Sequence, residues 1–376
     1  MIIGLLKEKE GENRVSALPE IVAGIIKLKS EVWFESNAGA ASFEGDDNYI
    51  KTGALLKTRN EILSGADIIL AIHLLGNHEI SKIKTGTVVI GVFQPLANFA
   101  QFFAWAEKNI TTLSLDMLPR TSRAQAMDIL SSQASVAGYK AVLVAAQYYP
   151  RYFPMLMTSA GTVTPAKVLI LGAGVAGLQA IATAKRLGAV VEVFDTRPAA
   201  KEEVMSLGAK FIEVEGAADA SKAGGYAVEQ TEEYKQKQQQ RIAEAVAKAD
   251  IIITTAQIPG KRAPVLVKTE MVNNMKTGSV IVDLAASSGG NCELSKNNEV
   301  VYYNGITIVG NSNLPGLVPA DASKLYGKNI LNFLKLLIND QGSLNLDFAD
   351  DLIAGACITH NKEVVNERVK AMAAHN

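Results

Sequence analysis

The sequence predicts an α/β fold in two lobes, each built on a parallel sheet, with the second lobe inserted into a discontinuous first lobe. Short β-branched apolar runs alternate with stretches of helical spacing along most of the chain. Such alternation is typical of parallel sheets covered by helices on both faces. The length of 376 residues is also sufficient for two domains. Together these observations place the chain among two-domain α/β proteins.

The first lobe is expected over residues 1–130 and 318–376. Its strands are expected, in chain order, at 2–6, 31–34, 67–72, 87–92 and 110–115, with an amphipathic helix at 18–29. An apolar-periodic helix at 320–339 leads the chain back to this lobe. Because the chain crosses between the lobes twice, we expect a hinge. Because this lobe has no glycine-rich turn, we expect it to close one side of a ligand cleft.

The most informative stretch of the second lobe, expected over 131–317, is a glycine-rich turn. A strand pattern at 167–171 ends in Gly172, and helical spacing follows at once. In the G-x-G-x-x-G pattern, Gly172 permits a tight turn, Gly174 lets a pyrophosphate approach the backbone, and Gly177 lets the helix pack on the strand. A turn without a ligand is the alternative, but the strand, turn and helix of a Rossmann dinucleotide site are all present.

A second strand, at 190–194, ends in Asp195, about 20 residues beyond the glycines, where an acidic side chain accepts the ribose hydroxyls of a dinucleotide. Since a carboxylate would repel a 2′-phosphate, Asp195 favours NAD(H) over NADP(H). Arg197 leaves two interpretations open. It can accommodate that phosphate, or it is a structural charge at the start of a helix whose first residue is Pro198.

The remaining strands of this lobe are expected at 211–215, 250–256, 279–285, 300–303 and 306–309. Between the first two of them lies a polar stretch, 216–241, which is rich in Gln, Glu and Lys and contains Gly225 and Tyr226. This stretch is either a mobile flap over a ligand or a solvated loop followed by a polar helix.

Composition narrows the classes of function. A net charge of −1 gives no basic field for nucleic acid or anionic lipid. Cys292 and Cys357 are expected to be small buried apolar residues, and neither they nor the four histidines are spaced as metal ligands, so no metal site is expected. Apolar runs such as 330–338 are shorter than a bilayer span, and charges follow Met1 too soon for a signal peptide. We therefore expect a soluble, cytoplasmic chain.

Two further features belong to the first lobe and its boundary. Arg14 follows the first strand, where open α/β sheets place ligand groups, although a solvated loop arginine fits the sequence equally well. An Ala-rich helix at 134–147 is expected to cross between the lobes.

The segment before that helix is unusually polar. If it is helical from about Arg123, then Gln125, Asp128 and Ser131 recur about every third residue and can face the same way. A helix-start signature is the alternative, with Ser122 as the cap and Gln125 three residues later. That signature does not account for Asp128 and Ser131, nor for the nearby Arg120.

This segment carries the most specific resemblance to a known family. The pattern R-x-S-R-A-Q-x-M-D-x-L-S-S-Q at 120–133, followed by A-G-Y-K-A, resembles nucleotide-binding domain I of the proton-translocating NAD(P) transhydrogenase alpha subunit. Similar matches occur at 153–155, in the Gly172 turn, at 195–197 and at 289–292, so that the resemblance covers nearly the whole chain.

The resemblance implies a role for each matching residue. Four would surround the nicotinamide and its ribose and form the catalytic set: Arg120, Gln125, Asp128 and Ser131. The pyrophosphate would lie against Val175, Ala176 and Gly177, and the adenosine ribose along Asp195, Thr196 and Arg197. Gly225 and Tyr226 would belong to a mobile loop over the nucleotide, with Gln238 and Gln257 as further contacts. Family members carry leucine at the last position, so that contact would be made through the backbone.

The resemblance also implies an activity and partners. NAD(H) on this chain would exchange a hydride directly with NADP(H) on a partner beta subunit, as in the Si-specific, proton-translocating NAD(P)+ transhydrogenase. Separate membrane subunits would couple this exchange to proton translocation. The chain would be a homodimer, peripheral on the cytoplasmic face of the inner membrane through its partner subunits.

Two alternatives remain open at this point. Alanine dehydrogenases resemble this family in fold, but amino-acid oxidation requires a general acid/base and a carboxylate anchor, for which they use a lysine and a histidine. The comparable strand ends here, 70–74 and 92–96, offer no lysine, and Gln94 stands about where the histidine is expected. Hydride exchange between two nicotinamides requires positioning instead. The second alternative is a non-catalytic NAD sensor.

Overall fold

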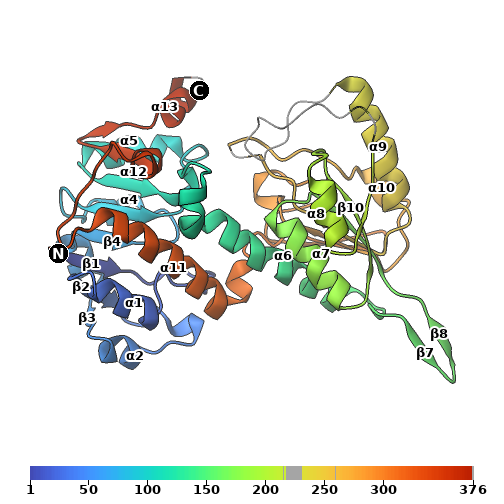
Figure 1. The fold of residues 1–376 in the computed structure, drawn as a ribbon, viewed down its shortest axis with the longest axis horizontal. Coiled ribbons are helices and arrows are strands. Elements are labelled where there is room, and N and C mark those ends of the chain that lie inside the picture. The colour runs from blue at the N-terminus through green and yellow to red at the C-terminus, as the bar shows by residue number, and fades with distance from the viewer. Residues whose placement is uncertain (215, 217–230, 259, 375–376) are drawn as a thin grey trace. The chain divides into compact units, whose positions relative to one another are not determined.

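A computed structural model describes residues 1–214, 216, 231–258 and 260–374 of the protein. The chain divides into two compact units, Met1–Gln133 with Pro315–Asn376, and Ala134–Leu314. The division at Gln133 falls inside one helix, α6 (Ile129–Tyr148). Figure 1 shows the course of the chain by colour.

The first unit is built on an eight-stranded sheet with the order β17-β16-β6-β5-β4-β1-β2-β3. Its strands are β1 (Ile2–Leu5), β2 (Glu31–Glu35), β3 (Leu55–Lys57), β4 (Ile68–Leu70), β5 (Val88–Gly91), β6 (Thr111–Ser114), β16 (Cys357–His360) and β17 (Glu363–Val364). The six neighbouring strands from β3 across the sheet to β6 are parallel and have the doubly wound order 3-2-1-4-5-6. The sequence did not predict β3, β16 or β17. The last two are antiparallel and come from the far end of the chain.

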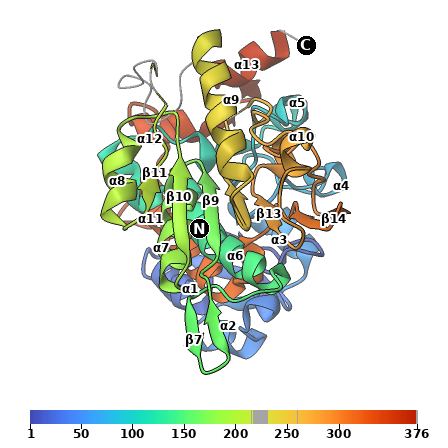
Figure 2. The ribbon, with the colours of Figure 1, turned by 90° about the vertical axis from the view of Figure 1, so that its right-hand side faces the viewer.

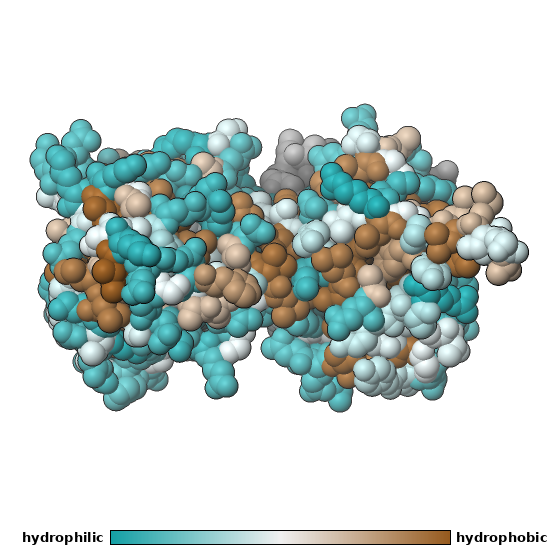
Figure 3. Space-filling model, turned by 90° about the horizontal axis from the view of Figure 1, so that it is seen from below, coloured by the Kyte–Doolittle hydropathy of each residue, from teal (hydrophilic) through white to brown (hydrophobic). Residues whose placement is uncertain are grey.

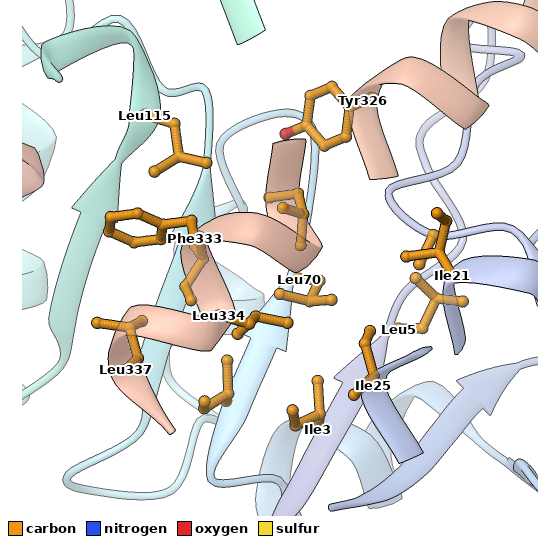
Figure 4. Close-up of a cluster of buried hydrophobic side chains, with 14 of the residues drawn as sticks. Ile3, Leu5, Ile21, Ile25, Leu70, Leu115, Tyr326, Phe333, Leu334 and Leu337 are labelled. Atoms are coloured by element: carbon orange, nitrogen blue, oxygen red, sulfur yellow. The ribbon is translucent and has the colours of Figure 1, made fainter. Parts of the chain in front are cut away.

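Alternating side chains of this sheet bury into two cores. On one face, Ile3 and Leu70 pack with α1 (Pro19–Ile26) and α11 (Pro319–Leu337), and Figure 4 shows Phe333 and its neighbours on α11 against the strands. The other face carries Ile69 and Val89 against α3 (Arg59–Gly65) and α5 (Phe99–Glu107). The remaining α-helices described in this unit are α2 (Asp46–Lys51), α4 (Asn77–Ile80), α12 (Asp351–Ala356) and α13 (Glu367–Ala374). Alternation along short apolar strands thus produces the expected covered sheet.

The second unit contains a seven-stranded sheet with the order β11-β10-β9-β12-β13-β15-β14. Its strands are β9 (Lys167–Leu171), β10 (Val190–Phe194), β11 (Lys210–Phe211), β12 (Ile251–Thr254), β13 (Val280–Asp283), β14 (Val300–Tyr303) and β15 (Ile306–Val309). All but β14 are parallel, again in the order 3-2-1-4-5-6. The strand order therefore reverses between β9 and β12. The third expected strand, 211–215, is reduced to two residues at 210–211.

Helices cover both faces of the second sheet. Helices α6, α7 (Val175–Arg186) and α8 (Ala200–Ser206) pack on the face that carries Val168 and Ile170. On the opposite face, α9 (Glu232–Val246) and α10 (Thr269–Val272) pack against Leu169 and Ile252. The fold class predicted from the sequence, two parallel-rich α/β sheets, is confirmed in both units.

A two-stranded hairpin, β7 (Leu156–Thr158) and β8 (Gly161–Val163), projects from the second unit beyond its sheet (Figures 1 and 2). It was not predicted from the sequence. Met155 and Met157 are 57% and 76% exposed, and hydrophobic residues are visible on the projecting end in Figure 3.

Helix α6 alone among the described residues has the length and mean hydropathy of a membrane-spanning helix, which corrects the expectation that no run reaches that length. Val142 and Ala145 of this helix lie in the core of the second unit, and buried helices of water-exposed domains share this composition. Cys292 and Cys357 are buried as expected, and burial raises the pKa of their thiols to about 11 and about 12.

Candidate functional site

The glycine turn lies where the strand order of the second sheet reverses, between β9 and β12. Gly172 has a φ of +108°, and a Cβ there would stand 2.5 Å from the Thr255 hydroxyl oxygen. A Cβ on Gly177 would stand 1.9 Å from the Gly172 carbonyl oxygen, whereas one on Gly174 would meet nothing within 4 Å. Gly172 and Gly177 are thus required by the turn and by the packing of helix on strand. Gly174 borders open space.

Helix α7 begins at Val175, directly after this turn. The first N–H groups of a helix have no acceptor within the helix, so those of Val175, Ala176 and Gly177 are available for an anion. Gly138 of α6 lies against this helix start, because a Cβ there would be 2.0 Å from the Ala176 carbonyl oxygen. This close packing of α6 holds the first turn of α7 in place. Local sequence pattern does not indicate the contact.

A second layer of hydrogen bonds holds the turn. The Thr255 hydroxyl donates to the Gly172 carbonyl oxygen over 3.0 Å. The next residue, Ala256, is bracketed by the buried side chain of Asn291, which accepts from its N–H and donates to its carbonyl. The buried Asp283 accepts from the neighbouring Cys292 N–H. This network was not predicted from the sequence.

Asp195 stands at the end of β10, beside the turn, with a side chain that is 7% exposed. It forms an ion pair with Arg197 and accepts the Ala173 N–H. Burial opposes ionisation of this carboxyl, but the hydrogen bonds and charge of Arg197 outweigh burial and lower its pKa. Pro198 does not begin a helix, since α8 starts at Ala200. Arg197 is a structural partner of Asp195, as one of the two interpretations held, and only the placement of Pro198 as the first helical residue is wrong.

The polar stretch after β11 contains a helix, as one interpretation predicted. In α9, Tyr234 and Gln238 lie one turn apart and share a face. Tyr234 is buried; its pKa is raised by that burial and by the charge of Asp195. Gln257 donates from its side chain to the Leu284 carbonyl oxygen. Gly225 and Tyr226 lie outside the described residues.

In the first unit, the predicted motif residues lie around the start of α6. The segment Ser122–Met127 is a 3-10 helix that ends before Asp128, and α6 begins at Ile129, so the condition of one helix from Arg123 through Ser131 is not met. Thr121, not Ser122, precedes that helix, and no side chain caps it. Arg123 instead pairs with Asp350 and Asp351 of the same unit.

Asp128 caps α6. Its carboxylate accepts the Ser131 N–H over 2.9 Å and the Ser131 hydroxyl over 2.6 Å. This contact explains the spacing of the two residues, which the sequence left open. Arg120 and Gln125 are exposed on the same stretch of chain.

A buried charge cluster occupies the corresponding reversal point of the first sheet, between β1 and β4. The Glu12 carboxylate accepts from Arg14 through Nε and Nη2 and contacts His73 Nε2 at 2.7 Å. Arg14 Nη1 donates to the Gln133 side-chain oxygen. Both partners of the ion pair are buried, at 9% and 1% exposure, and the interactions of Arg14 and His73 outweigh burial to lower the pKa of Glu12 well below its usual range. Arg14 is therefore not a solvated loop residue. The sequence did not indicate Glu12 or His73.

Comparisons with known proteins agree with this architecture. The chain matches the families described as alanine dehydrogenase/PNT, N-terminal domain, over residues 4–137, and alanine dehydrogenase/PNT, C-terminal domain, over residues 141–367. It is 45% identical, over 100% of both chains, to an NAD(P) transhydrogenase alpha-subunit chain of Rhodospirillum rubrum.

Solved structures of similar proteins have the same fold. The transhydrogenase of Sinorhizobium meliloti is 45% identical, with a TM-score of 0.89 over 97% of this chain and 100% of that one. An L-alanine dehydrogenase with 24% identity and a TM-score of 0.83 over 100% of this chain and 99% of that one shares the fold. The transhydrogenase relatives support an oxidoreductase role. The chain thus belongs to the alanine dehydrogenase/PNT family, in which it is similar to the alpha subunits of NAD(P) transhydrogenases.

Proposed function

We propose that the second domain, residues 131–317, binds NAD(H), with the pyrophosphate against the N–H groups of Val175, Ala176 and Gly177. The single observation that carries this proposal is the glycine turn at the reversal point of the sheet, with the carboxylate of Asp195 one strand away. A helix start favours the negative pyrophosphate, and Asp195 with Thr196 suits the adenosine ribose. Gly172 sets the turn, and Gly174 leaves the backbone open to the ligand.

We further propose that this NADH gives a hydride directly to NADP+ held by a partner beta subunit. Transfer between two nicotinamide carbons moves no proton at the reacting atoms, so catalysis requires alignment of the rings. Arg120, Gln125, Asp128 and Ser131 would supply it by holding the nicotinamide and its ribose. The fixed Asp128–Ser131 contact suits such a positioning role. Gly225, Tyr226, Gln238 and Gln257 would add contacts to the same nucleotide.

The charge cluster of the first unit disfavours amino-acid oxidation. A substrate carboxylate would need a cationic anchor, and Arg14 is the buried arginine at this point of the sheet. Its guanidinium already donates to Glu12 and Gln133. A substrate anion would have to compete with the Glu12 carboxylate for this guanidinium, and its binding would leave Glu12 buried without its counter-charge.

The assembly is also part of the proposal. The relatives are named as subunits, which supports a beta-subunit partner and separate membrane subunits that couple the exchange to proton translocation. The exposed β7–β8 hairpin, with Met155 and Met157, offers apolar surface for a homodimer contact. The first domain would cover 1–130 and 318–376, and the chain would lie on the cytoplasmic face of the inner membrane.

The decisive experiment follows a labelled hydride. NADH deuterated at C4 is mixed with this chain, NADP+ and the beta subunit, and the label is sought in NADPH by mass spectrometry. We expect direct transfer without exchange with solvent. Tight NADH binding without label transfer would indicate a sensor. Robust NADH oxidation by the chain alone with pyruvate and ammonia would indicate an amino-acid dehydrogenase.

A further inference from the structure

We infer that the Arg197 side chain is a placeholder for the nucleotide. Its guanidinium occupies the positions on the Asp195 carboxylate that the ribose hydroxyls take, so NADH must displace it to bind. This inference rests on the proposed NAD(H) site and adds a competing group within the chain.

The acceptor positions of the Asp195 carboxylate are fully occupied. One oxygen accepts from the Arg197 backbone N–H at 2.8 Å and from its Nε at 2.9 Å. The other oxygen accepts from Arg197 Nη2 at 2.8 Å and from the Ala173 N–H at 2.7 Å. A carboxylate has about four lone-pair positions, and all are taken. Ribose hydroxyls cannot donate to this carboxylate until one or more of these donors leaves.

Of these donors, the two on the Arg197 guanidinium, Nε and Nη2, can move away from the Asp195 carboxylate. The Ala173 N–H follows Gly172 in the turn, whose backbone is fixed by Thr255 and by the packing of Gly177. The Arg197 N–H is likewise part of the main chain. The Arg197 side chain is 24% exposed, against 7% for Asp195, and can rotate without moving the backbone. Its departure opens one position on each carboxylate oxygen, which matches the two hydroxyls of a ribose.

The placeholder has two consequences. Without nucleotide, it neutralises a carboxylate that is largely buried and holds it in the ionised form that accepts hydroxyls. With nucleotide, it lowers the apparent affinity, because only the fraction of molecules with a displaced guanidinium is ready to bind. Removal of the guanidinium should therefore strengthen NADH binding, the opposite of what loss of a nucleotide contact would do.

The test compares NADH dissociation constants of the full chain with Arg197→Met, Arg197→Lys and a charge control, Lys201→Met. Lys201 lies on α8 and pairs with Glu213, so its loss removes one positive charge from the same unit without touching Asp195. We expect Arg197→Met to bind NADH about threefold to tenfold more tightly than Lys201→Met. Arg197→Lys keeps the charge but not the paired donors, and should fall between wild type and Arg197→Met.

Thermal unfolding supplies a second readout. Arg197→Met should melt below the wild type without nucleotide, because Asp195 loses its partner, and saturating NADH should narrow that difference. Equal or weaker NADH binding by Arg197→Met than by Lys201→Met would overturn the placeholder. If Arg197→Met fails to fold, Arg197→Lys takes its place: tighter NADH binding than wild type supports the inference, and equal or weaker binding overturns it. Absence of NADH binding by the wild type would instead refute the proposed site itself.

Discussion

The two units carry the same acidic-x-arginine arrangement, with different access to solvent. In Glu12-Asn13-Arg14 and in Asp195-Thr196-Arg197, the arginine N–H and Nε donate to one carboxylate oxygen and Nη2 donates to the other. The arginine is 9% exposed in the first unit and 24% exposed in the second. The same geometry therefore occurs twice: the Glu12–Arg14 pair is shielded from solvent, and we call it the closed pair. The Asp195–Arg197 pair has a more exposed arginine, and we call it the accessible pair.

The surroundings explain the difference. In the first unit, side chains complete the arrangement: His73 contacts the Glu12 oxygen that also accepts from Arg14 Nη2, and the Gln133 side chain accepts from Arg14 Nη1. In the second, a backbone N–H of the glycine turn takes the place of the histidine. The Glu12 pair stands at the reversal point of its doubly wound sheet, where ligands bind, and the Asp195 pair stands one strand away from the reversal point of the second sheet. In the first unit, the side chains of Glu12, Arg14 and His73 occupy the reversal point. In the second unit, the glycine turn lies there and exposes its backbone.

The largest expected effect is on the closed pair. Glu12→Gln leaves Arg14 buried without its counter-charge, which should lower the free energy of unfolding by about 3–5 kcal/mol. Both tryptophans, Trp33 and Trp105, lie in the first unit, so tryptophan fluorescence during urea unfolding reports on it. Asp195→Asn is the matched control and should leave this transition unchanged. Equal shifts of this transition in both variants would contradict the assignment of the buried pair to the stability of the first unit.

At the accessible pair, the expected effect is on binding. Asp195→Ala removes the acceptor of two ribose hydroxyls, and hydrogen bonds to a charged group contribute about 1.5–3 kcal/mol. NADH affinity, followed by NADH fluorescence, should fall about tenfold to a hundredfold. Unchanged affinity would remove Asp195 from the ribose site.

Substitutions in the glycine turn should distinguish a glycine required for packing, Gly177, from one that borders open space, Gly174. Gly177→Ala forces a Cβ against the Gly172 carbonyl and should cost about 1–3 kcal/mol of stability, together with NADH binding. Gly174→Ala meets no neighbour and should retain wild-type stability, which circular dichroism during thermal unfolding can check. Equal destabilisation by both substitutions would contradict the distinction between the two glycines.

Gln125→Ala tests the proposed alignment of the nicotinamide. Gln125 is exposed, so folding should be unaffected, while the rate of label transfer should fall about tenfold because a small misplacement of reacting groups slows transfer. Stopped-flow measurement at saturating NADH isolates this step. An unaltered rate would exclude Gln125 from the site.

Acid should reduce the difference between wild type and Glu12→Gln. The folded-state pKa of Glu12 is lowered, so its stabilisation is present above its unfolded pKa and is lost as the pH falls. Below about pH 4.3, the gap in unfolding free energy should shrink by up to about 1.4 kcal/mol per pH unit. Burial raises the pKa of Glu8, which acts in the opposite sense, and the charge of Glu12 adds to that shift, so both proteins are compared in a Glu8→Gln background. A gap that is constant from pH 7 to pH 3 would contradict the pairing.

The sequence by itself determined the features that depend on neighbouring residues. Apolar alternation predicted the central strands of both sheets, helical spacing predicted α7 and α11, and the glycine spacing predicted the turn at Gly172, because each follows from local backbone geometry. The position of Asp195 at the end of β10 also came from local pattern.

Only the tertiary structure decided what those residues contact. Arg14 meets Gln133 across 119 positions of sequence, and Asn291 brackets Ala256 across 35. The same holds for β16, which joins the first sheet from the far end of the chain. Such contacts depend on which strands become neighbours, and single-sequence periodicity does not encode that choice. For this reason the sequence located Arg14 and Arg197, but only the fold distinguished the buried arginine from the accessible one.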